Sequence, residues 1–254
     1  MPIGNPLKRK LLANQPCLGS WLLTTSPDMA EIMAYAGLDF LLIDHEHGQG
    51  AIDDAVCQLR ALKGSDCVGV LRVPTNDRIY IKRALDAGVG GIMVPNIDTA
   101  EQAKAVVDAC RYAPVGRRGA FGGMRAMHYG FDPGYYARVD DETLIVVQVE
   151  NPGAIDNIAE IAAVPGIDVV FIGPRDLSAN LGKLNQFTDP VVKGEIERAE
   201  AAILKSGKIL GSTAANGKVA REMAALGHRF IISGSDATLL GSAAAALLAD
   251  AKAG

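Results

Sequence analysis

The chain has 254 residues, of which 49% are hydrophobic, and its 25 basic and 29 acidic side chains give a formal net charge of −4. This length is enough to bury one large hydrophobic core. The absence of a basic run argues against a nucleic-acid-binding protein, and there is no acidic tail. No apolar segment reaches the roughly 20 residues that a membrane-spanning helix needs.

Residues 1–15 carry a short basic patch without an apolar stretch behind it, which is not the pattern of a secretion signal. The four cysteines show no C-x-x-C spacing; they are Cys17, Cys57, Cys67 and Cys110. This pattern predicts buried free thiols in a reducing compartment, in preference to disulfides or a zinc site. We therefore expect a cytoplasmic protein.

Apolar runs and helical patterns alternate along the whole chain. Several predicted helices end at a glycine, which tolerates the left-handed turn back into the next strand. The predicted strands cover residues 17–23, 39–44, 67–73, 91–95, 143–149, 168–173, 208–213 and 229–234. The predicted helices cover residues 26–36, 52–62, 77–87, 98–112, 152–164, 189–205, 216–226 and 237–251. Ser26 is the expected N-cap of the first helix, and Asp98 with Glu101 forms an expected capping box.

Eight β/α units in a chain of this length predict an α/β fold, a (β/α)8 TIM-type barrel formed as a single domain by residues 1–254. An open doubly wound sheet is the alternative, but it usually has fewer strands, and the chain lacks a G-x-G-x-x-G loop. The connection at 111–140 is unusually long and rich in glycine, arginine and aromatic residues. Such a loop predicts a lid or a substrate-recognition segment.

The polar residues of interest lie where the predicted strands end, which is where barrel enzymes carry their chemistry. In chain order they are Asp44, His47, Arg72, Gln148, Glu150, Gly173, Pro174 and Asp176. Because equivalent ends of parallel strands meet at one rim, Glu150 and Asp176 are expected to share a cation. Two carboxylates with water in the other positions suit Mg²⁺ or Mn²⁺. The alternative is that each acid caps the helix after its strand.

His47 lies three residues after Asp44, and a carboxylate beside an imidazole is a usual arrangement for a general base. A histidine making only a local hydrogen bond is the alternative. A zinc site made by His45, Glu46 and His47 is disfavoured, because alternation in an extended segment turns His45 away from its neighbours.

Arg72 ends an otherwise apolar strand, which predicts that it faces an anion: either the acids of the rim or a substrate carboxylate. The turn at 234–236 has the sequence Gly-Ser-Asp and could bind phosphate, as barrels often do after their last two strands.

Four motifs together resemble the HpcH/HpaI family of class II, metal-dependent pyruvate aldolases, of the 2-oxo-3-deoxy acid aldolase type. They are LLIDHEHG at 41–48, LRVP at 71–74, VQVE at 147–150 and FIGPRDLS at 171–178. The similarity extends over nearly the whole chain in order and spacing. It includes KRALDAG at 82–88, RYAPVGRRG at 111–119 and the Gly-Ser-Asp segment at 234–236.

The resemblance implies a homohexamer, a trimer of dimers, in which a C-terminal helix is exchanged between subunits. It implies Mg²⁺, Mn²⁺ or Co²⁺ bound by Glu150 and Asp176. It also implies that Arg72 binds the pyruvate carboxylate and that Gln148 lies beside the ketoacid. In the resemblance His47 is the catalytic histidine, with Asp44 as its partner. Asp86 would reach into the active site of the neighbouring subunit. The loop 119–129 would select the aldehyde, and Arg125 is a candidate for binding its distal end.

The implied reaction is the reversible cleavage of a 2-oxo-3-deoxy (4-hydroxy-2-oxo) acid to pyruvate and an aldehyde. A divalent ion stabilises the pyruvate enolate, so no Schiff-base lysine is required, and no lysine is predicted inside a strand at the rim. The alternatives are an acyl-CoA lyase of the malyl- or citryl-CoA type, a phosphate-handling barrel, and a barrel kept as a non-catalytic binding protein.

Overall fold

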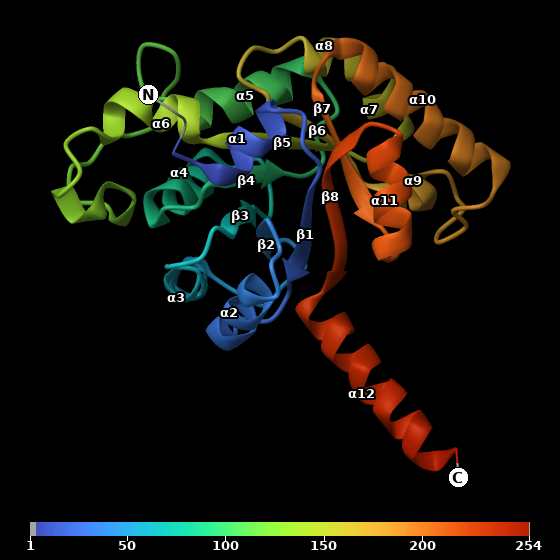
Figure 1. Ribbon diagram of the computed structural model, residues 1–254. Coiled ribbons are helices and arrows are strands. Elements are labelled where there is room, and N and C mark those ends of the chain that lie inside the picture. Colours follow the sequence, from blue (N-terminus) through green and yellow to red (C-terminus); the bar gives the residue numbers. More distant parts are fainter. Residues whose placement is uncertain (1–3, 254) are drawn as a thin grey trace.

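Eight parallel strands close into a barrel in the order of the sequence, and the last strand pairs with the first (Figure 1). This is a computed structural model that describes residues 4–253. The strands are β1 Cys17–Leu22, β2 Phe40–Asp44, β3 Val68–Arg72, β4 Gly91–Val94, β5 Leu144–Val149, β6 Val169–Ile172, β7 Ile209–Ala214 and β8 His228–Ser235. The predicted barrel and all eight strands are confirmed, and the open-sheet alternative is wrong.

The interior of the barrel is filled by large side chains that alternate along the strands. They include Phe40, Leu42, Val70, Met93, Val146, Phe171 and Phe230. The rings of Phe40 and Phe230 stack with their centroids 4.2 Å apart. A short helix that the sequence did not reveal, α1 Pro6–Leu12, adds Leu7 and Leu11 to this cluster. Because α1 precedes β1, it closes the end of the barrel at which the strands begin.

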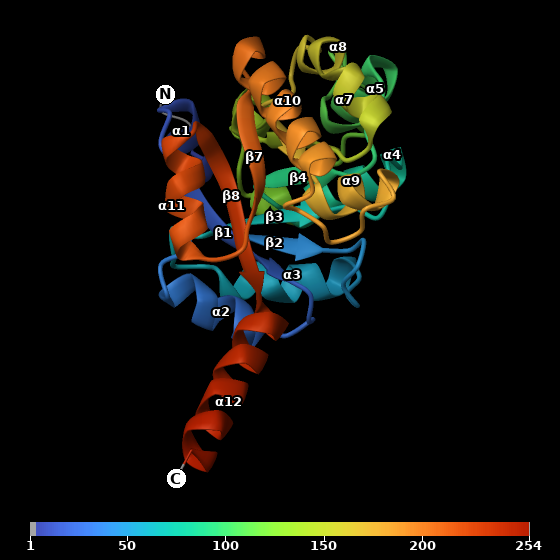
Figure 2. The same ribbon diagram turned by 90° about the vertical axis from the view of Figure 1, so that its right-hand side faces the viewer.

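Helices cover the outside of the barrel (Figures 1 and 2). They are α2 Pro27–Tyr35, α3 Ile52–Ala61, α4 Arg78–Ala87, α5 Ala100–Cys110, α7 Pro152–Asp156, α8 Ile158–Ala162, α9 Pro174–Asn180, α10 Pro190–Ser206 and α11 Gly217–Ala225. Ser26 caps α2 as predicted, since its hydroxyl accepts the Met29 N–H at 3.3 Å. The predicted helix 152–164 is two short helices, because the chain leaves helical geometry at Asn157.

The expected capping box of Asp98 and Glu101 is wrong by one residue. Thr99 caps α5, and its partner is Gln102, whose amide oxygen accepts the Thr99 N–H at 3.1 Å. Asp98 instead accepts a 2.6 Å hydrogen bond from the side chain of Asn151. The Asp98 carboxylate is therefore used in a tertiary hydrogen bond, and the N-cap of α5 is the next residue, Thr99.

The long segment 111–140 is more ordered than a loop. It holds the short helix η1 Arg125–Gly130 and the start of α6 Tyr135–Glu142, which pack through a separate apolar cluster. The members of this cluster are Met124, Met127, Tyr135 and Val139. In Figure 1 the segment lies at the edge of the molecule, beside α4.

The last helix, α12 Asp236–Lys252, leaves the barrel and extends away from every other element (Figures 1 and 2). It carries four leucines that are more than half exposed: Leu239, Leu240, Leu247 and Leu248. Its first residue is fixed. The fully buried Asp236 carboxylate accepts the N–H groups of Leu23 and Thr24, each at 3.0 Å.

All four cysteines are free, as expected, and three of them are buried. Burial raises the pKa of Cys17, Cys67 and Cys110 to about 12, so these thiols stay protonated. Cys57 is exposed, which corrects the prediction that every thiol is buried. Among the described residues, no helix has the length and apolar character needed to cross a membrane.

Candidate active site

The carboxyl ends of β2, β3, β5 and β6 bring the predicted polar residues to one rim. Asp44 and Arg72 end their strands side by side, because the parallel register pairs them directly. Gln148 on β5 is paired with Phe171 on β6, so Glu150 and Gly173 follow their strands as neighbours. The rim predicted from the strand ends is therefore formed.

Arg72 is the most tightly held charge at this rim. Its Nε and Nη2 donate to the two carboxylate oxygens of Asp44 at 2.9 and 2.6 Å. Its Nη1 forms a 2.8 Å ion pair with Glu46. The Arg72 side chain is 6% exposed and the Asp44 side chain is fully buried. The rim acids thus take three of the five guanidinium N–H groups, which leaves two for a substrate.

The ring of Trp21 packs against the face of the Arg72 guanidinium. The Arg72 guanidinium carbon lies 4.2 Å from the centroid of the Trp21 ring, within the range of a cation–π contact. The ring also meets Phe171 edge-on at 6.4 Å. Trp21 was not among the residues predicted to form the site. The only feature of the sequence that points to it is that the single tryptophan of the chain lies near the end of a predicted strand.

Glu150 is a buried carboxylate that has no basic partner in residues 4–253. It is 2% exposed, its Oε1 accepts the Asn96 backbone N–H at 2.9 Å, and its Oε2 accepts a hydrogen bond from the Gln148 side chain. Burial raises its pKa to about 7, and the negative charges of Asp176 and Glu46 push the pKa the same way. An acid in this setting favours a cation or a proton.

The Asn96 backbone is shaped for this contact. Asn96 follows β4 and has φ +56°, a left-handed conformation that only a few non-glycine residues adopt. This turn directs its N–H at Glu150. In the sequence, only the position of Asn96 just after a predicted strand points to this contact.

Gly173 leaves the room that Glu150 occupies. A Cβ at this position would lie 2.6 Å from Glu150 Oε2 and 3.0 Å from Gln148 Nε2. Any larger residue would push the carboxylate away, so the glycine is required by close approach. The Gln148 side-chain oxygen is buried without a hydrogen-bond partner in the described part of the chain. The unpaired Gln148 oxygen and the closely packed Glu150 carboxylate are both suitable ligands for a cation.

The alternative that the two acids merely cap helices is wrong. Asn151 caps α7, because its side-chain oxygen accepts the Ala154 N–H at 2.9 Å. Asp176 lies inside the first turn of α9, which has no side-chain cap, behind Pro174 at its first position. Asn180 donates to the backbone carbonyls of Glu150 and of Asp176 in its own helix, at 3.1 and 3.0 Å, and so ties α9 to the segment after β5.

The expected pairing of His47 with Asp44 is not formed through the imidazole. Asp44 Oδ1 accepts the backbone N–H groups of Glu46 and His47, at 3.0 and 3.3 Å, and both carboxylate oxygens bind Arg72. The His47 side chain is exposed at the rim. The register of β2 and β3, which places Arg72 beside Asp44, decides this pairing.

His45 points the other way, as alternation predicted. It is 7% exposed, and its Nδ1 lies 2.9 Å from the Tyr80 hydroxyl on α4. Burial lowers its pKa. In residues 4–253, no group of three or more His, Cys, Asp or Glu side chains could hold a metal ion. The orientation of His45 toward Tyr80 separates it from Glu46 and His47, as the sequence predicted.

Glu46, which the sequence suggested only as a disfavoured zinc ligand, is a further acid of the rim. Its pKa is raised by burial, and Arg72 opposes this shift. It holds Nη1 of Arg72 and interacts electrostatically with Asp176. Glu46 therefore lies between Arg72 and the acid Asp176 of the rim.

Two predicted site residues lie away from the rim of their own barrel. Asp86 on α4 forms a 2.8 Å ion pair with the buried Arg118. Arg125 on η1 donates to the Ala87 carbonyl at 2.5 Å, next to the turn that leads into β4. The carboxyl end of a helix that leads into a strand, such as the end of α4 before β4, lies at the amino ends of the strands. Within one chain, Arg125 therefore cannot reach a substrate at the carboxyl rim.

The turn at 234–236 is already occupied by the chain itself. Ser235 caps α12 by accepting the Thr238 N–H at 3.0 Å, and Asp236 binds the segment after β1. Its polar groups are satisfied internally, which removes the support for a phosphate-handling barrel.

Comparisons with known proteins agree with this rim. Residues 18–243 match the family described as HpcH/HpaI aldolase/citrate lyase. The chain is 43% identical over 252 residues to a hydroxypyruvate/pyruvate aldolase of Deinococcus radiodurans, covering 99% of this chain and 91% of the relative. It is 42% identical over 238 residues to a 2-keto-3-deoxy-L-rhamnonate aldolase of Klebsiella pneumoniae, covering 93% of this chain and 89% of the relative.

A crystal structure of a family protein from Burkholderia cenocepacia superimposes with a TM-score of 0.94 at 35% identity, covering 98% of this chain and all of that one. Relatives at about 40% identity over nearly their full length are named aldolases. The chain is thus an enzyme, a carbon–carbon lyase of the aldolase type, and the non-catalytic alternative is wrong. It belongs to the HpcH/HpaI aldolase/citrate lyase family.

Proposed function

We propose that this aldolase reversibly cleaves a 4-hydroxy-2-oxo acid to pyruvate and an aldehyde, with a divalent cation held by Glu150 and Asp176. The observation that carries the proposal is the buried Glu150 carboxylate, which lacks a basic partner among the described residues and lies close enough to Asp176 for their charges to interact. Relatives named pyruvate aldolase and keto-deoxy acid aldolase support the substrate class.

The donor set fits a hard cation such as Mg²⁺, Mn²⁺ or Co²⁺. Glu150 and Asp176 interact electrostatically, the side-chain oxygen of Gln148 has no hydrogen-bond partner among the described residues, and Gly173 leaves the room that the Glu150 carboxylate occupies. When bound, the cation would withdraw negative charge from the 2-oxo acid as its carbon–carbon bond breaks.

Arg72 provides the contact for the carboxylate of the 2-oxo acid. Asp44 and Glu46 fix its guanidinium, Trp21 supports its face, and two N–H groups remain for the substrate. A guanidinium held on three sides loses little conformational freedom when it binds an anion. Asp44 therefore acts through Arg72, and it is a positioning residue.

His47 is the exposed base of the rim. In the cleavage direction its imidazole takes the proton from the C4 hydroxyl as the C3–C4 bond breaks, and the carbonyl of the aldehyde forms. In the synthesis direction it returns that proton to the aldehyde oxygen. Its backbone N–H is anchored on Asp44, which fixes the distance of the loop from Arg72.

The assembly implied by the family resemblance is a homohexamer, in which α12 docks on another copy and Asp86 approaches a neighbouring site. The exposed leucines of α12 support docking, since a row of large apolar side chains on a projecting helix favours burial.

The test is pyruvate release from a panel of 4-hydroxy-2-oxo acids, with malyl-CoA and citryl-CoA as the acyl-CoA arm. The metal-free chain is assayed with and without added Mg²⁺, Mn²⁺ or Co²⁺. Activity on the oxo acids is expected only with metal, and Glu150→Gln and Asp176→Asn should each abolish it while leaving the barrel folded. Full activity of Glu150→Gln in EDTA would refute the metal site, and release from the CoA esters alone would refute the substrate class.

A further inference from the structure

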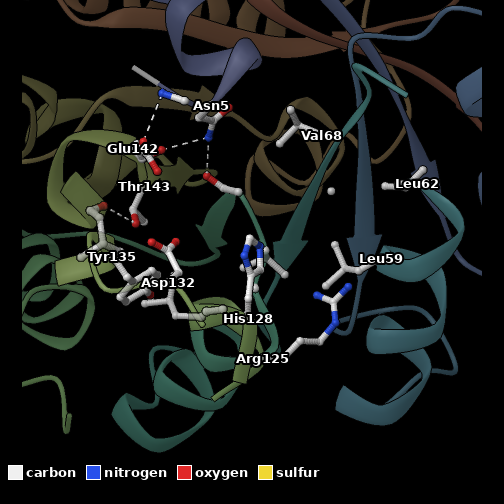
Figure 3. A pocket seen from close by; sticks show the side chains of 18 of the residues that line it. Asn5, Leu59, Leu62, Val68, Arg125, His128, Asp132, Tyr135, Glu142 and Thr143 are labelled. Atoms are coloured by element: carbon white, nitrogen blue, oxygen red, sulfur yellow. Dashed lines mark hydrogen bonds between the residues drawn. The ribbon is translucent and has the colours of Figure 1, made fainter. Parts of the chain in front are cut away.

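A large cavity lies at the end of the barrel opposite the catalytic rim (Figure 3). It has a volume of about 620 Å³, within the range of small-molecule sites. Its walls come from the ends of α3 and α4, the amino ends of β3 and β4, η1 and α6. Leu59, Leu62 and Val68 contribute apolar side chains to its lining, and Arg125 and His128 also line it, with the Arg125 guanidinium beside Leu59.

The cavity carries more positive charge than its own acids balance. Arg60, Lys63, Arg125 and Arg138 line it, against the two acids Asp132 and Glu142. Both acids are already paired with Arg138. Within the described range 4–253, Arg60, Lys63 and Arg125 form no ion pair. The surplus is local, because the chain as a whole has a net charge of −4.

Arg125 is the best placed of these cations. One of its terminal nitrogens donates to the Ala87 carbonyl, which anchors the guanidinium and leaves its other N–H groups for a ligand. The residue is half-buried, and its pKa is lowered by burial and by the neighbouring charge of Arg60. Two arginines that repel each other at the edge of a cavity are stabilised by a shared anion.

The segment that closes the cavity is held in an unusual backbone conformation. His128 and Tyr129 both have left-handed φ angles, +50° and +59°, although neither is glycine. The Tyr129 N–H is fixed on the Met124 carbonyl at 3.0 Å. Such conformations cost free energy and are concentrated at ligand-binding segments. Here the turn brings His128 and Tyr129 to the cavity beside Arg125.

We propose that this cavity is a second ligand site, which binds a small organic polyanion. Arg125, Arg60 and Lys63 bind its carboxylate or phosphate groups, and Leu59 and Leu62 pack against its carbon skeleton. The site is separate from the aldolase rim, because β3 and β4 run the length of the barrel between them. It gives Arg125 a role at the end of the barrel where its own chain places it.

The experiment is isothermal titration calorimetry on the full-length, metal-free chain with two probes. Tricarballylate supplies carboxylates without an oxo or hydroxyl group that could react, and glucose 6-phosphate supplies a phosphate ester. Saturable binding of one or both is expected, and the better probe identifies the anionic group. Arg125→Gln and the pair Arg60→Gln/Lys63→Gln should each raise the Kd about tenfold or more, as for a lost charge-assisted contact.

Two control variants test whether the probe binds in this cavity. Lys104→Gln, which removes an exposed lysine of α5 outside the cavity, should leave the Kd unchanged. Glu150→Gln should also leave it unchanged, whereas a changed Kd would place the probe at the catalytic rim and overturn the proposal. Arg125→Lys should restore part of the affinity lost in Arg125→Gln, which separates the charge from a folding defect.

Three other results would overturn the inference: no binding of either probe, equal binding by Arg125→Gln, or a crystal structure in which another copy of the chain fills the cavity. The aldolase assay above does not depend on any of these outcomes, so the two proposals fail separately.

Discussion

Arg72 and Asp44 form a two-point ion pair across adjacent strands, with Nε and Nη2 of the arginine on the two oxygens of a fully buried carboxylate. Under the proposed function, this pair links the stability of the barrel to substrate binding, because the remaining N–H groups of the same arginine would bind the 2-oxo acid.

The first prediction concerns this pair. Arg72→Met should lower the free energy of unfolding by roughly 3–5 kcal/mol, since it leaves a buried carboxylate uncompensated. The double variant Arg72→Met/Asp44→Asn should recover much of the loss, because the buried charge is gone. Urea unfolding of the metal-free chain measures both. The exposed pair of Arg198 with Glu195 is the comparison, where Arg198→Met should cost about 1 kcal/mol or less. Equal losses at the two sites would show that the Arg72 pair is no stronger than a surface pair.

The second prediction concerns Gly173. Gly173→Ala places a methyl group 2.6 Å from Glu150 Oε2, so the carboxylate must move. The Kd for Mn²⁺ should rise by about 10–100-fold, as for other residues that orient a metal ligand. Gly194→Ala is the matched control, because a Cβ there meets nothing within 4 Å inside helix α10. It should stabilise the chain by about 0.5–1 kcal/mol without changing metal affinity. An unchanged Kd in Gly173→Ala would show that the cation does not use Glu150.

The third prediction concerns pH. Burial raises the Glu150 pKa to about 7, so below this pH the folded chain holds a proton where a cation needs the carboxylate. Mn²⁺ affinity should therefore fall about tenfold for each pH unit below 7. The stability of the metal-free chain should change with pH in the opposite direction to the metal affinity. Because the pKa of Glu150 is higher in the folded chain than in the unfolded chain, its contribution to the free energy of unfolding is complete below the unfolded pKa. That contribution is lost as the pH rises through about 7. Titration of Mn²⁺ at several pH values and urea unfolding in EDTA check the two slopes, and Glu150→Gln should remove both. Metal affinity that is flat between pH 5.5 and 7 would contradict the assignment.

The fourth prediction separates His47 from the cation site. His47→Ala should slow aldol cleavage by roughly 10²–10⁴-fold, the usual loss for a positioned base. If the proposed cation site of Glu150 and Asp176 supports hydrogen exchange at the pyruvate methyl, the rate of that exchange should fall less than the rate of cleavage. Both rates are measured on the same preparation, by pyruvate release and by NMR in deuterated water. Equal losses in the two reactions would mean that His47 organises the rim and does not serve the aldehyde oxygen.

The fifth prediction concerns α12. The paired substitutions Leu247→Glu and Leu248→Glu should lower the order of assembly, because two exposed apolar side chains become charged. Sedimentation velocity measures the assembly, and circular dichroism should show an unchanged barrel. Lys252→Glu on the same helix is the charge control. An assembly of the same size in the double variant and the unaltered chain would show that these leucines are not buried by assembly.

The sequence determined the barrel because parallel strands covered on both faces must be continuous apolar runs, and each of the eight runs is bounded by glycine or polar residues. It also determined the composition of the rim, since the acids and Arg72 directly follow those runs. These are local signals, and they require no knowledge of which side chains meet.

The tertiary structure decided the partners. Asp44 binds Arg72 and not the His47 imidazole, because the β2–β3 register places the arginine beside it. Trp21 on β1 contacts Arg72 on β3 because both strands pair with β2, which lies between them. Arg125 leaves the rim because η1 packs against the end of α4, at the opposite end of the barrel. A side chain's neighbours depend on strand register and helix packing, which are set by contacts between residues far apart in the chain.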